Sequence, residues 1–528
     1  MKRWYALIVF MAATLAAMQP IRSYDYFWHL ATGRWIFDHS AIPRTDPFAL
    51  ASARIPWING EWLFQVVLYP FQHAFGHEGV SLGRAALLGL IFALGFRFAA
   101  RIASPSFAAL LVAVCWYGAV DRLGARPSSV AALLVVVAIL ILSSSLPAGW
   151  RAASYALLSI VWINVHPSAL LAPVLAALWW FGSMIHGDER QPSSGGYRGV
   201  LVPAASALAL LLNPFGLRGI SAPLNLVSSV TSGAFVNAEW LPSSPVVFPL
   251  LYLTIVMAAV AFVKDGQWRE HAGPLLILAL LAVLSLQHVR NQGLYFAAYP
   301  LLCARAIPRM ATERLKVIAA IATATLVLLV LVRHDFGSGI DRSVFPVNAV
   351  RQLETSGLQG NVYNPDQFGG YLIWNFYPQR RVLQDGRNEL YADYLREYEA
   401  ARLDGRKWKQ LLVKYRLSLA IDEYHRESVD VVDFVTKRHR SVPVSRIYFP
   451  KSEWALIEFD DVAMVFARRA DYPPAVLAPM EFAHLVPDAG TVDISSVERE
   501  AWRREIAVAR ARMGSLAVLD RMEAKLGK

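Results

Sequence analysis

The chain has 528 residues, of which 55% are hydrophobic and only 17% are charged, whereas a soluble globular domain carries about 25% charged residues. Its mean hydropathy is +0.37, and its apolar residues fall in many runs, each about long enough to cross a bilayer core of roughly 30 Å. Composition therefore excludes an ordinary soluble enzyme and predicts a polytopic protein in contact with a lipid bilayer. Lys and Arg outnumber Asp and Glu by 51 to 40, largely at the ends of apolar runs, where basic residues set orientation. We expect no nucleic-acid partner.

The N-terminal 19 residues have a basic start and an apolar core, which is also typical of a signal peptide. The apolar stretch continues to Met18 and a polar loop follows at once, so we expect a retained first helix. The two cysteines, Cys115 and Cys303, each lie inside an apolar run. We interpret them as small buried hydrophobic side chains, not as a disulfide or a metal site.

Eleven apolar runs predict eleven membrane spans. They cover residues 4–20, 80–100, 106–120, 129–146, 152–165, 168–186, 200–213, 247–263, 272–287, 292–307 and 314–332. The segment from Trp62 to Phe75 is shorter and interrupted, and we expect an interfacial or re-entrant helix there. Basic residues between alternate spans, such as Arg151, Lys264 and Arg305, indicate the cytoplasmic face. The first loop, 21–79, and everything after residue 333 then lie on the opposite face.

After residue 333 the charge rises and short β-like stretches replace the long apolar runs. Alternating strand and helix signals predict an α/β domain at 334–470. Residues 471–528 form a C-terminal extension, and a stripe of apolar residues from about 495 to 528 predicts one charged amphipathic helix. The predicted fold class is therefore an α-helical polytopic membrane domain, residues 1–333, with a C-terminal α/β extracytoplasmic domain.

Two motifs stand out within the α/β domain. Gly369 and Gly370 are interpreted as a turn into a strand that continues to Trp374. Asp385-Gly is a common turn signal, which leaves Arg387 open as a contact to an acceptor glycan or to the membrane domain.

Asp25 and His29 are the first candidate site residues of the loop at 21–79. A carboxylate held near the interface can deprotonate an acceptor hydroxyl or bind a divalent metal; pairing of Asp25 with Arg22 or Arg34 is equally compatible with the sequence. His29 follows four residues later, so a helical start to the loop would place both on one face. A metal pair or an Asp-oriented base can form there, although a hydrogen-bonded interfacial histidine is the more common case.

Two further acidic residues complete the acidic set of the loop. Asp46 precedes Pro47, and Asp-Pro is a common turn starter, so a structural role competes with substrate binding. Glu61 lies directly before Trp62, where it can cap a helix while facing a polar chamber.

With alternating spans, polar residues near the span ends gather on the outer face. Ionisable groups at membrane depth are costly unless they face a cavity, so this gathering predicts a polar chamber that opens outward. Its candidate members are Asp25, His29, Asp46, Glu61, Asp121, Arg122, Arg126, Trp162, Asn164, His166, Asn213, Glu239, Trp240, His288, Arg290 and Asn291.

The loop resembles a known family. Asp25-Tyr-Phe-Trp-His-Leu, Pro43-Arg-Thr-Asp-Pro and Trp57-Ile-Asn-Gly-Glu look like the first outer loop of GT-C type glycosyltransferases, and more closely like a group of uncharacterised bacterial polytopic proteins of that class. The resemblance covers most of the chain to about residue 466. Its other motifs are Gly124-Ala-Arg-Pro, Trp162-Ile-Asn-Val-His, Asn213-Pro-Phe-Gly, Glu239-Trp-Leu-Pro, Gly369-Gly-Tyr-Leu-Ile-Trp and Asp385-Gly-Arg.

The resemblance implies an inverting membrane glycosyltransferase that transfers a sugar from a polyprenyl-phosphate donor to a glycan, lipid or protein acceptor. It implies the bacterial inner membrane, with a cytoplasmic N-terminus and a periplasmic C-terminal domain. An acidic residue early in this loop is catalytic in GT-C enzymes, and Asp25 is the matching position, as base or as ligand of a divalent metal (Mg²⁺ or Mn²⁺). Many such enzymes carry two adjacent acids, whereas Tyr26 follows Asp25 here.

The cations of the outer face suit the same chemistry. Transfer from a lipid phosphate requires positive charge beside the departing phosphate oxygen. Arginine can hold phosphate with two donors, which favours Arg126 and Arg290 over His288; snorkelling to the interface is the alternative. His166 is included as a binding residue because Asn164 and the following proline make a polar break inside apolar sequence.

Two other functions fit the sequence. A transporter or flippase for lipid-linked saccharides would show charged residues at mid-span and broken helices in paired positions. A non-catalytic assembly factor of cell-surface polysaccharide would keep the fold and bind the donor without transfer. The predicted spans have few charged residues at their centres, and their polar residues lie at the outer ends. This pattern favours the transferase.

Overall fold

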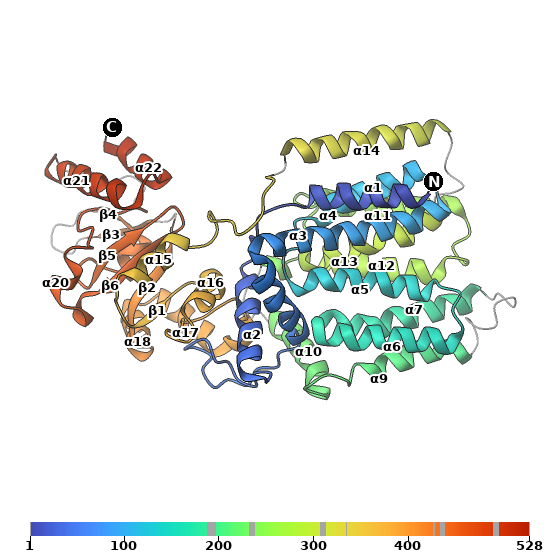
Figure 1. Ribbon diagram of the computed structural model, residues 1–528, viewed down its shortest axis with the longest axis horizontal. Coiled ribbons are helices and arrows are strands. Elements are labelled where there is room, and N and C mark those ends of the chain that lie inside the picture. Colours follow the sequence, from blue (N-terminus) through green and yellow to red (C-terminus); the bar gives the residue numbers. More distant parts are fainter. Residues whose placement is uncertain are drawn as a thin grey trace. The chain divides into compact units, whose positions relative to one another are not determined.

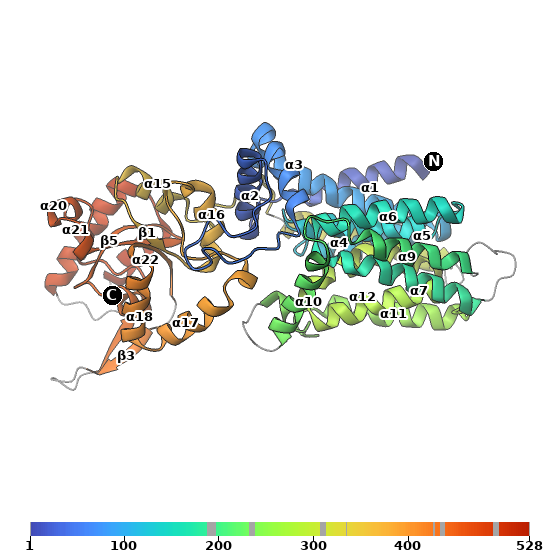
Figure 2. The same ribbon diagram turned by 90° about the horizontal axis from the view of Figure 1, so that it is seen from below.

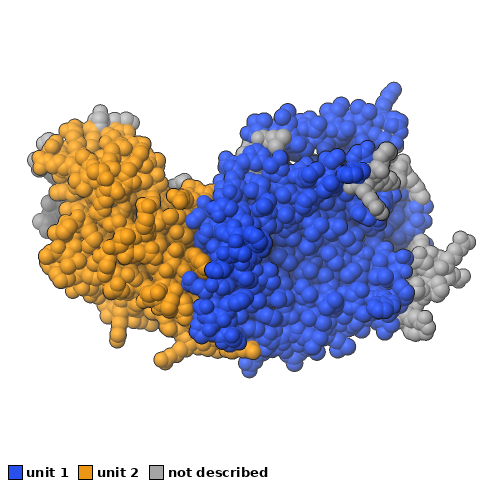
Figure 3. All heavy atoms as spheres, viewed as in Figure 1, with its two compact units in different colours: residues 1–42, 58–340 blue, residues 43–57, 341–528 orange. Residues whose placement is uncertain are grey.

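The computed structural model describes residues 2–186, 197–231, 238–306, 313–333, 335–425, 428–432, 439–488 and 496–526. The chain divides into two compact units (Figure 3). Unit 1 comprises residues 1–42 and 58–340, and unit 2 comprises residues 43–57 and 341–528. The chain thus enters unit 2 within the first loop and returns to unit 1 before it crosses again. The predicted three-part division at 333 and 470 stays a prediction.

Unit 1 is a helical bundle (Figure 1). Each of the eleven apolar runs forms a helix: α1 (Lys2–Ala16), α3 (Trp62–Ile102), α4 (Pro105–Ala119), α5 (Pro127–Leu142), α6 (Ala148–Val165), α7 (Leu171–His186), α9 (Leu201–Ala209), α11 (Pro249–Asp265), α12 (Ala272–Gln287), α13 (Gln292–Cys303) and α14 (Glu313–Arg333). Within the described residues, the stretches Trp62–Ile102 and Pro167–Ile185 are long and apolar enough to cross a membrane. The total of eleven spans therefore stays a prediction.

The remaining helical elements of unit 1 connect the bundle helices. They are α2 (Asp25–His39), α10 (Leu217–Thr231) and the short turns η1 (Pro167–Leu170), η2 (Tyr197–Val200), η3 (Ala238–Trp240), η4 (Val289–Asn291) and η5 (Ala304–Ala306). α2 runs across the direction of the bundle helices (Figures 1 and 2). Within α3, Gly76 has φ +68°, a conformation that favours glycine. This break separates the segment expected as a short helix, Trp62 to Phe75, from the apolar helix after it.

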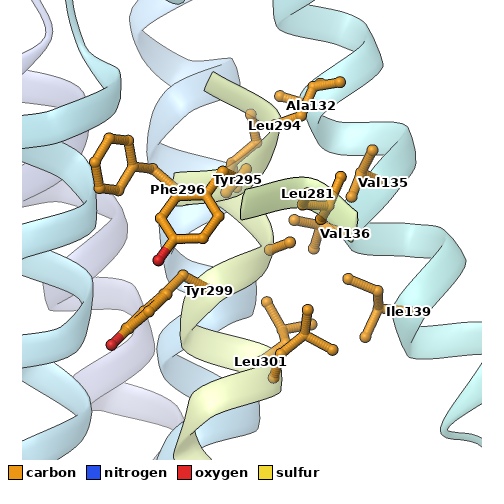
Figure 4. Packing of buried hydrophobic residues seen from close by; sticks show 14 of the residues in the cluster. Ala132, Val135, Val136, Ile139, Leu281, Leu294, Tyr295, Phe296, Tyr299 and Leu301 are labelled. Carbon is orange, nitrogen blue, oxygen red and sulfur yellow. The ribbon is translucent and has the colours of Figure 1, made fainter. Parts of the chain in front are cut away.

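The core of unit 1 is built around α13, in which every residue is buried. Figure 4 shows its Leu294 and Leu301 on the side of α5, which contributes Val136 and Ile139, whereas the rings of Tyr295 and Tyr299 point the other way. Thr254 of α11 accepts hydrogen bonds from two buried tyrosine hydroxyls. Tyr295 donates to its Oγ1 (3.2 Å), and Tyr299 donates to its backbone carbonyl oxygen (2.9 Å). A fully packed helix has little freedom to shift, so α13 gives the turn that precedes it a rigid base.

The cysteine prediction is confirmed, because Cys115 and Cys303 are both buried free thiols. They lie on α4 and α13 within the apolar core.

Unit 2 contains a mixed sheet in the order β1-β2-β6-β5, formed by β1 (Asn361–Tyr363), β2 (Leu417–Glu423), β5 (Trp454–Phe459) and β6 (Ala463–Arg468). β1 pairs with β2 in parallel, and the other neighbours are antiparallel, with Ile421 opposite Val465. β3 (Ser428–Val432) and β4 (His439–Pro443) form a separate antiparallel pair. β5 is buried along its whole length and β6 along all but its last residue, as expected for a sheet covered on both faces.

Helices complete unit 2, and the predicted α/β character is confirmed. They are α15 (Val347–Thr355), α16 (Asp366–Phe376), α17 (Ala392–Arg402), α18 (Gly405–Lys414), α19 (Val444–Tyr448), α20 (Pro474–Leu477), α21 (Ser496–Met513) and α22 (Ala517–Leu526), with the short turns η7 (Asn388–Leu390) and η8 (Arg469–Asp471).

Two local predictions for unit 2 are wrong. The stretch Gly369–Trp374 lies in α16 and not in a strand; Gly369 serves close packing, since a Cβ there would lie 2.1 Å from the carbonyl oxygen of Gln384. The expected single helix at 495–528 is divided between Met513 and Ala517, where Gly514 has φ +82°. Positions 495, 527 and 528 lie outside the described residues.

Candidate functional site

Asp25 is the first residue of α2, so the loop has the helical start that would place Asp25 and His29 on one face. An acidic side chain is favoured in the first turn of a helix, where backbone N–H groups are unpaired. Its Oδ1 accepts a hydrogen bond from the indole Nε1 of Trp28 (3.1 Å). A third of the Asp25 side chain stays exposed, which leaves the carboxylate accessible to a bound molecule.

Arg126 lies between two carboxylates. It precedes Pro127, the first residue of α5. Its Nη1 atom lies 2.6 Å from Oε1 of Glu239 and 3.7 Å from Oδ2 of Asp25. Glu239 belongs to η3, and the sequence placed it on the outer face without assigning it a role. One guanidinium nitrogen thus joins groups that are far apart in the sequence.

Arg290 belongs to the turn η4, directly before the buried helix α13. Its guanidinium lies over the ring of Trp240 in η3. Its guanidinium carbon lies 4.5 Å from the centroid of Trp240, a cation–π contact. His288 fixes that ring, because its Nδ1 donates to the carbonyl oxygen of Trp240 (2.7 Å). Within the described residues, the Arg290 guanidinium makes no hydrogen bond or ion pair, so its five donors are available to a ligand.

His29 and Glu61 form a second pair. Asn59 donates to Oε1 of Gln65 (2.7 Å), and the Gln65 amide donates to Nδ1 of His29 (3.3 Å). Because Nδ1 accepts this bond, the proton of the neutral ring is on Nε2, which faces Oε2 of Glu61 at 3.9 Å. His29 is thereby oriented toward a carboxylate, and the chain of amides fixes its tautomer.

His166 follows the last residue of α6, and its Nδ1 accepts a hydrogen bond from the backbone N–H of Ser168 (3.1 Å). Burial and the two nearby guanidiniums of Arg290 and Arg126 lower the pKa of His166 to about 3. The ring is therefore neutral near pH 7. It can donate or accept a hydrogen bond but does not contribute a positive charge.

The charged side chains of the candidate site shift one another's pKa values. Burial raises the pKa of Asp25 above its ordinary value, against the opposing effects of Arg126 and of the bond from Trp28. Burial also raises the pKa of Glu239, but its contacts with Arg126 outweigh that effect and the net pKa is lowered. Glu61 lies within electrostatic range of both arginines. Asp25, Glu239 and Glu61 therefore lie in the field of Arg126 and Arg290, and Arg122 adds a further positive charge near Glu239.

Asp46 belongs to unit 2, whereas the group around Asp25 belongs to unit 1. It is fully buried, and Nη2 of Arg387 lies 3.0 Å from its Oδ1. It also accepts hydrogen bonds from the backbone N–H of Phe48 (3.1 Å) and from the hydroxyl of Ser52. Asp385 accepts hydrogen bonds from Nε and Nη2 of the same guanidinium. The segment 43–57 is thus anchored by a buried ion pair, and the substrate-binding role of Asp46 stays a prediction.

The carboxylates of the site do not form a metal centre. Within the described residues, no three His, Cys, Asp or Glu side chains are grouped so that they could hold a metal ion. The position facing both Asp25 and Glu239 contains Nη1 of Arg126. The expected divalent metal therefore does not fit the residues as they are arranged.

The sequence placed Glu239 and Trp240 on the outer face without assigning either a role, and it missed Gln65. Glu239 stands in a short polar stretch, and no periodicity marks it. Trp240 was an outer-face aromatic residue, and its contact with Arg290 depends on how η3 and η4 pack. Gln65 lies inside an apolar helix, where a lone amide is the only available signal.

The fold thus combines a helical bundle, with a polar cluster at its loops, and a mixed α/β unit. The chain is similar in structure to the oligosaccharyltransferase AglB of the archaeon Archaeoglobus fulgidus in complex with an inhibitory peptide and a dolichol-phosphate: the TM-score is 0.54 at 9% identity, over 98% of this chain and 84% of that one.

Two further structures of the same oligosaccharyltransferase match. The apo form has a TM-score of 0.58 at 10% identity, and the complex with Zn and sulfate has 0.54 at 10% identity; each covers 99% of this chain and 85% of the other. No family model and no curated protein matches the sequence. The comparisons therefore show a fold shared with an oligosaccharyltransferase, which agrees with the GT-C resemblance of the loop motifs.

Proposed function

We propose that the chain is a membrane glycosyltransferase that transfers a sugar from a polyprenyl-phosphate donor to a hydroxyl acceptor, with inversion. The observation that carries the proposal is an accessible carboxylate, Asp25, within electrostatic range of the guanidinium of Arg290. This transfer needs a base for the acceptor and a cation for the leaving phosphate. The shared fold with an oligosaccharyltransferase, one structure of which contains dolichol-phosphate, supports the same class of donor.

Asp25 is the proposed base. The acceptor oxygen attacks the anomeric carbon while the bond from that carbon to the phosphate oxygen breaks, and the acceptor proton passes to the Asp25 carboxylate. The electron pair of the broken bond leaves with the phosphate. Burial raises the pKa of Asp25, which makes its ionised form a stronger base than a solvated aspartate.

Arg290 is the proposed phosphate ligand. Its guanidinium is oriented by stacking on Trp240, and no carboxylate within the described residues is bonded to it. An arginine in this state can donate two parallel hydrogen bonds to phosphate oxygens. Arg126, by contrast, is bonded to Glu239 at 2.6 Å. We therefore assign the phosphate to Arg290, and we assign to Arg126 the role of holding the two carboxylates.

His29, Glu61 and His166 are proposed to bind the donor or acceptor. The oriented His29–Glu61 pair presents a carboxylate within electrostatic range of Arg290, which suits hydroxyl groups of a sugar. His166 is neutral and buried beside the arginines, so it can hydrogen-bond to a sugar or phosphate oxygen.

A membrane location is part of the proposal. Residues of α14 such as Val317, Ile321 and Leu328 are more than 40% exposed although they are apolar, and such faces are costly in water. The bilayer would cover them. We propose the inner membrane, with the candidate site on its outer face.

The test is transfer of sugar from a purified polyprenyl-phosphate sugar by the detergent-solubilised chain and its Asp25→Asn variant. Loss of transfer in a folded D25N protein that still binds donor would support Asp25 as base. Undiminished transfer by D25N would remove the mechanism. Donor binding by the unaltered chain without transfer to any hydroxyl acceptor would indicate a non-catalytic assembly factor instead.

A further inference from the structure

We propose that this chain works without a resident divalent metal, because the Arg126 guanidinium takes the place of a metal between the Asp25 and Glu239 carboxylates. The inference rests on the proposed function and concerns the electrostatics of that same site. It departs from the fold neighbour, one structure of which contains Zn and sulfate.

Nη1 of Arg126 occupies the position that a shared metal ion would take. A divalent metal shared by two carboxylates lies between them, about 2.0–2.6 Å from each ligating oxygen. Here a single nitrogen, Nη1 of Arg126, lies between Oε1 of Glu239 (2.6 Å) and Oδ2 of Asp25 (3.7 Å). A metal ion in that position would be within contact distance of a positive charge. The guanidinium and a metal ion therefore exclude each other.

The position of Arg126 is fixed by the fold. It directly precedes Pro127 at the first position of α5, with extended backbone at φ −148° and ψ 164°. Its backbone N–H donates to the carbonyl of Gly124 (2.9 Å), and the hydroxyl of nearby Ser129 donates to the same carbonyl (2.6 Å). Its side chain is less than one-fifth exposed. A buried arginine cannot lose its proton, so its charge is permanent at this point.

The two arginines also supply the positive charge that a metal ion would bring to Asp25 and Glu239. A divalent metal beside two carboxylates would leave the group neutral before any donor binds. Arg126 supplies one positive charge and Arg290 a second within electrostatic range of the same carboxylates, so the two guanidiniums deliver the charge of one divalent ion. Arg126 orients Asp25, and Arg290 is left to meet the phosphate.

The absence of a second acid beside Asp25 agrees with this arrangement. Tyr26 occupies the next position and is buried, and its hydroxyl bonds to Nδ1 of His77 (2.8 Å). It therefore faces a different part of unit 1 and offers no oxygen to a metal held by Asp25.

Binding of Mn²⁺ alone to the purified full-length chain tests the proposal, measured by electron paramagnetic resonance. We expect no site that depends on Asp25 in the unaltered protein. In Arg126→Ala, the two carboxylates lose their cation, and we expect Mn²⁺ affinity to rise by at least about tenfold, because the positive charge that would repel the metal ion is removed. Asp25→Asn in the R126A background should abolish the gain.

A second measurement keeps the test decisive if R126A does not fold. Sugar transfer by the unaltered chain is followed in excess EDTA and then with Mn²⁺ or Mg²⁺ added. Unchanged transfer in EDTA supports the inference. Transfer that requires the metal overturns it and leaves the proposed function intact, as does a Mn²⁺ site in the unaltered protein that D25N removes. A folded R126A without any gain in Mn²⁺ binding also overturns it.

The two proposals fail in different ways. If no transfer occurs with or without metal, the proposed function fails, while the Mn²⁺ titrations still decide whether Arg126 replaces a metal.

Discussion

Nη1 of Arg126 lies 2.6 Å from Oε1 of Glu239, across 113 residues of sequence. This ion pair fixes the arginine that faces Asp25, and it ties the start of α5 to the η3 turn. The candidate site therefore depends on loops that come together only when the bundle has formed.

The acid limb of the pH profile should report Asp25. Burial raises its pKa, so the ionised base is lost at a higher pH than for a solvated aspartate, and kcat/KM for transfer should fall as pH drops through that pKa. Arg126 lowers the pKa of Asp25, so R126A should move the acid limb to higher pH. D25N should lower kcat by about 100-fold or more. An acid limb that stays in place in folded R126A would contradict the assignment.

Replacing Arg290 should weaken transfer at the chemical step. R290A removes the donors proposed for the leaving phosphate and should lower kcat by about 100- to 1,000-fold, whereas R290K keeps the charge and should lose less. Arg269 is the matched control, because it stacks on Trp268 at 5.4 Å in the connection between α11 and α12. R269A should leave both kcat and KM unchanged. Equal losses in R290A and R269A would show a general effect of breaking an Arg–Trp contact.

Gly33 should control the position of α2. A Cβ at this residue would lie 2.3 Å from the carbonyl oxygen of Gln65 and 2.7 Å from Cβ of Tyr69. G33A should therefore push α2 away from α3, cost about 1–3 kcal/mol of stability and lower kcat by displacing Asp25. Thermal unfolding and steady-state kinetics measure the two effects. In the control G149A, where nothing lies within 4 Å, both should stay at the level of the unaltered chain; full activity in G33A would contradict the positioning argument.

The buried triad of Asp46, Arg387 and Asp385 should stabilise unit 2. All three side chains are inaccessible to solvent, so R387M leaves buried carboxylates without their cation and should cost roughly 3–5 kcal/mol in the free energy of unfolding. Urea unfolding of the detergent-solubilised chain measures it. In the control R396A, the lost partner Asp393 is exposed, and the cost should stay below about 1 kcal/mol. Similar costs for the two variants would show that the triad adds nothing beyond a surface pair.

The sequence by itself determined the elements whose signals are local. Long apolar runs produce helices wherever they occur, because backbone groups away from water must bond within their own segment, and each of the eleven runs forms a helix. The early acid of the loop, Asp25, was recognised from its place after the first helix and from the loop motif. The strand at Leu417–Glu423 followed from its β-rich composition.

Only the tertiary structure decided which polar groups meet. Asp25, Arg126, Glu239 and Arg290 come from four loops, and no spacing in the sequence encodes their distances. Asp46 was grouped with Asp25 because both lie in one loop, yet it pairs with Arg387 within unit 2. The physical reason is the same in both cases: a charge removed from water must find a partner, and the fold, not the sequence neighbourhood, supplies it. Nη1 of Arg126 lies 3.7 Å from Oδ2 of Asp25, whereas the sequence had suggested Arg22, Arg34 or a divalent metal as its partner.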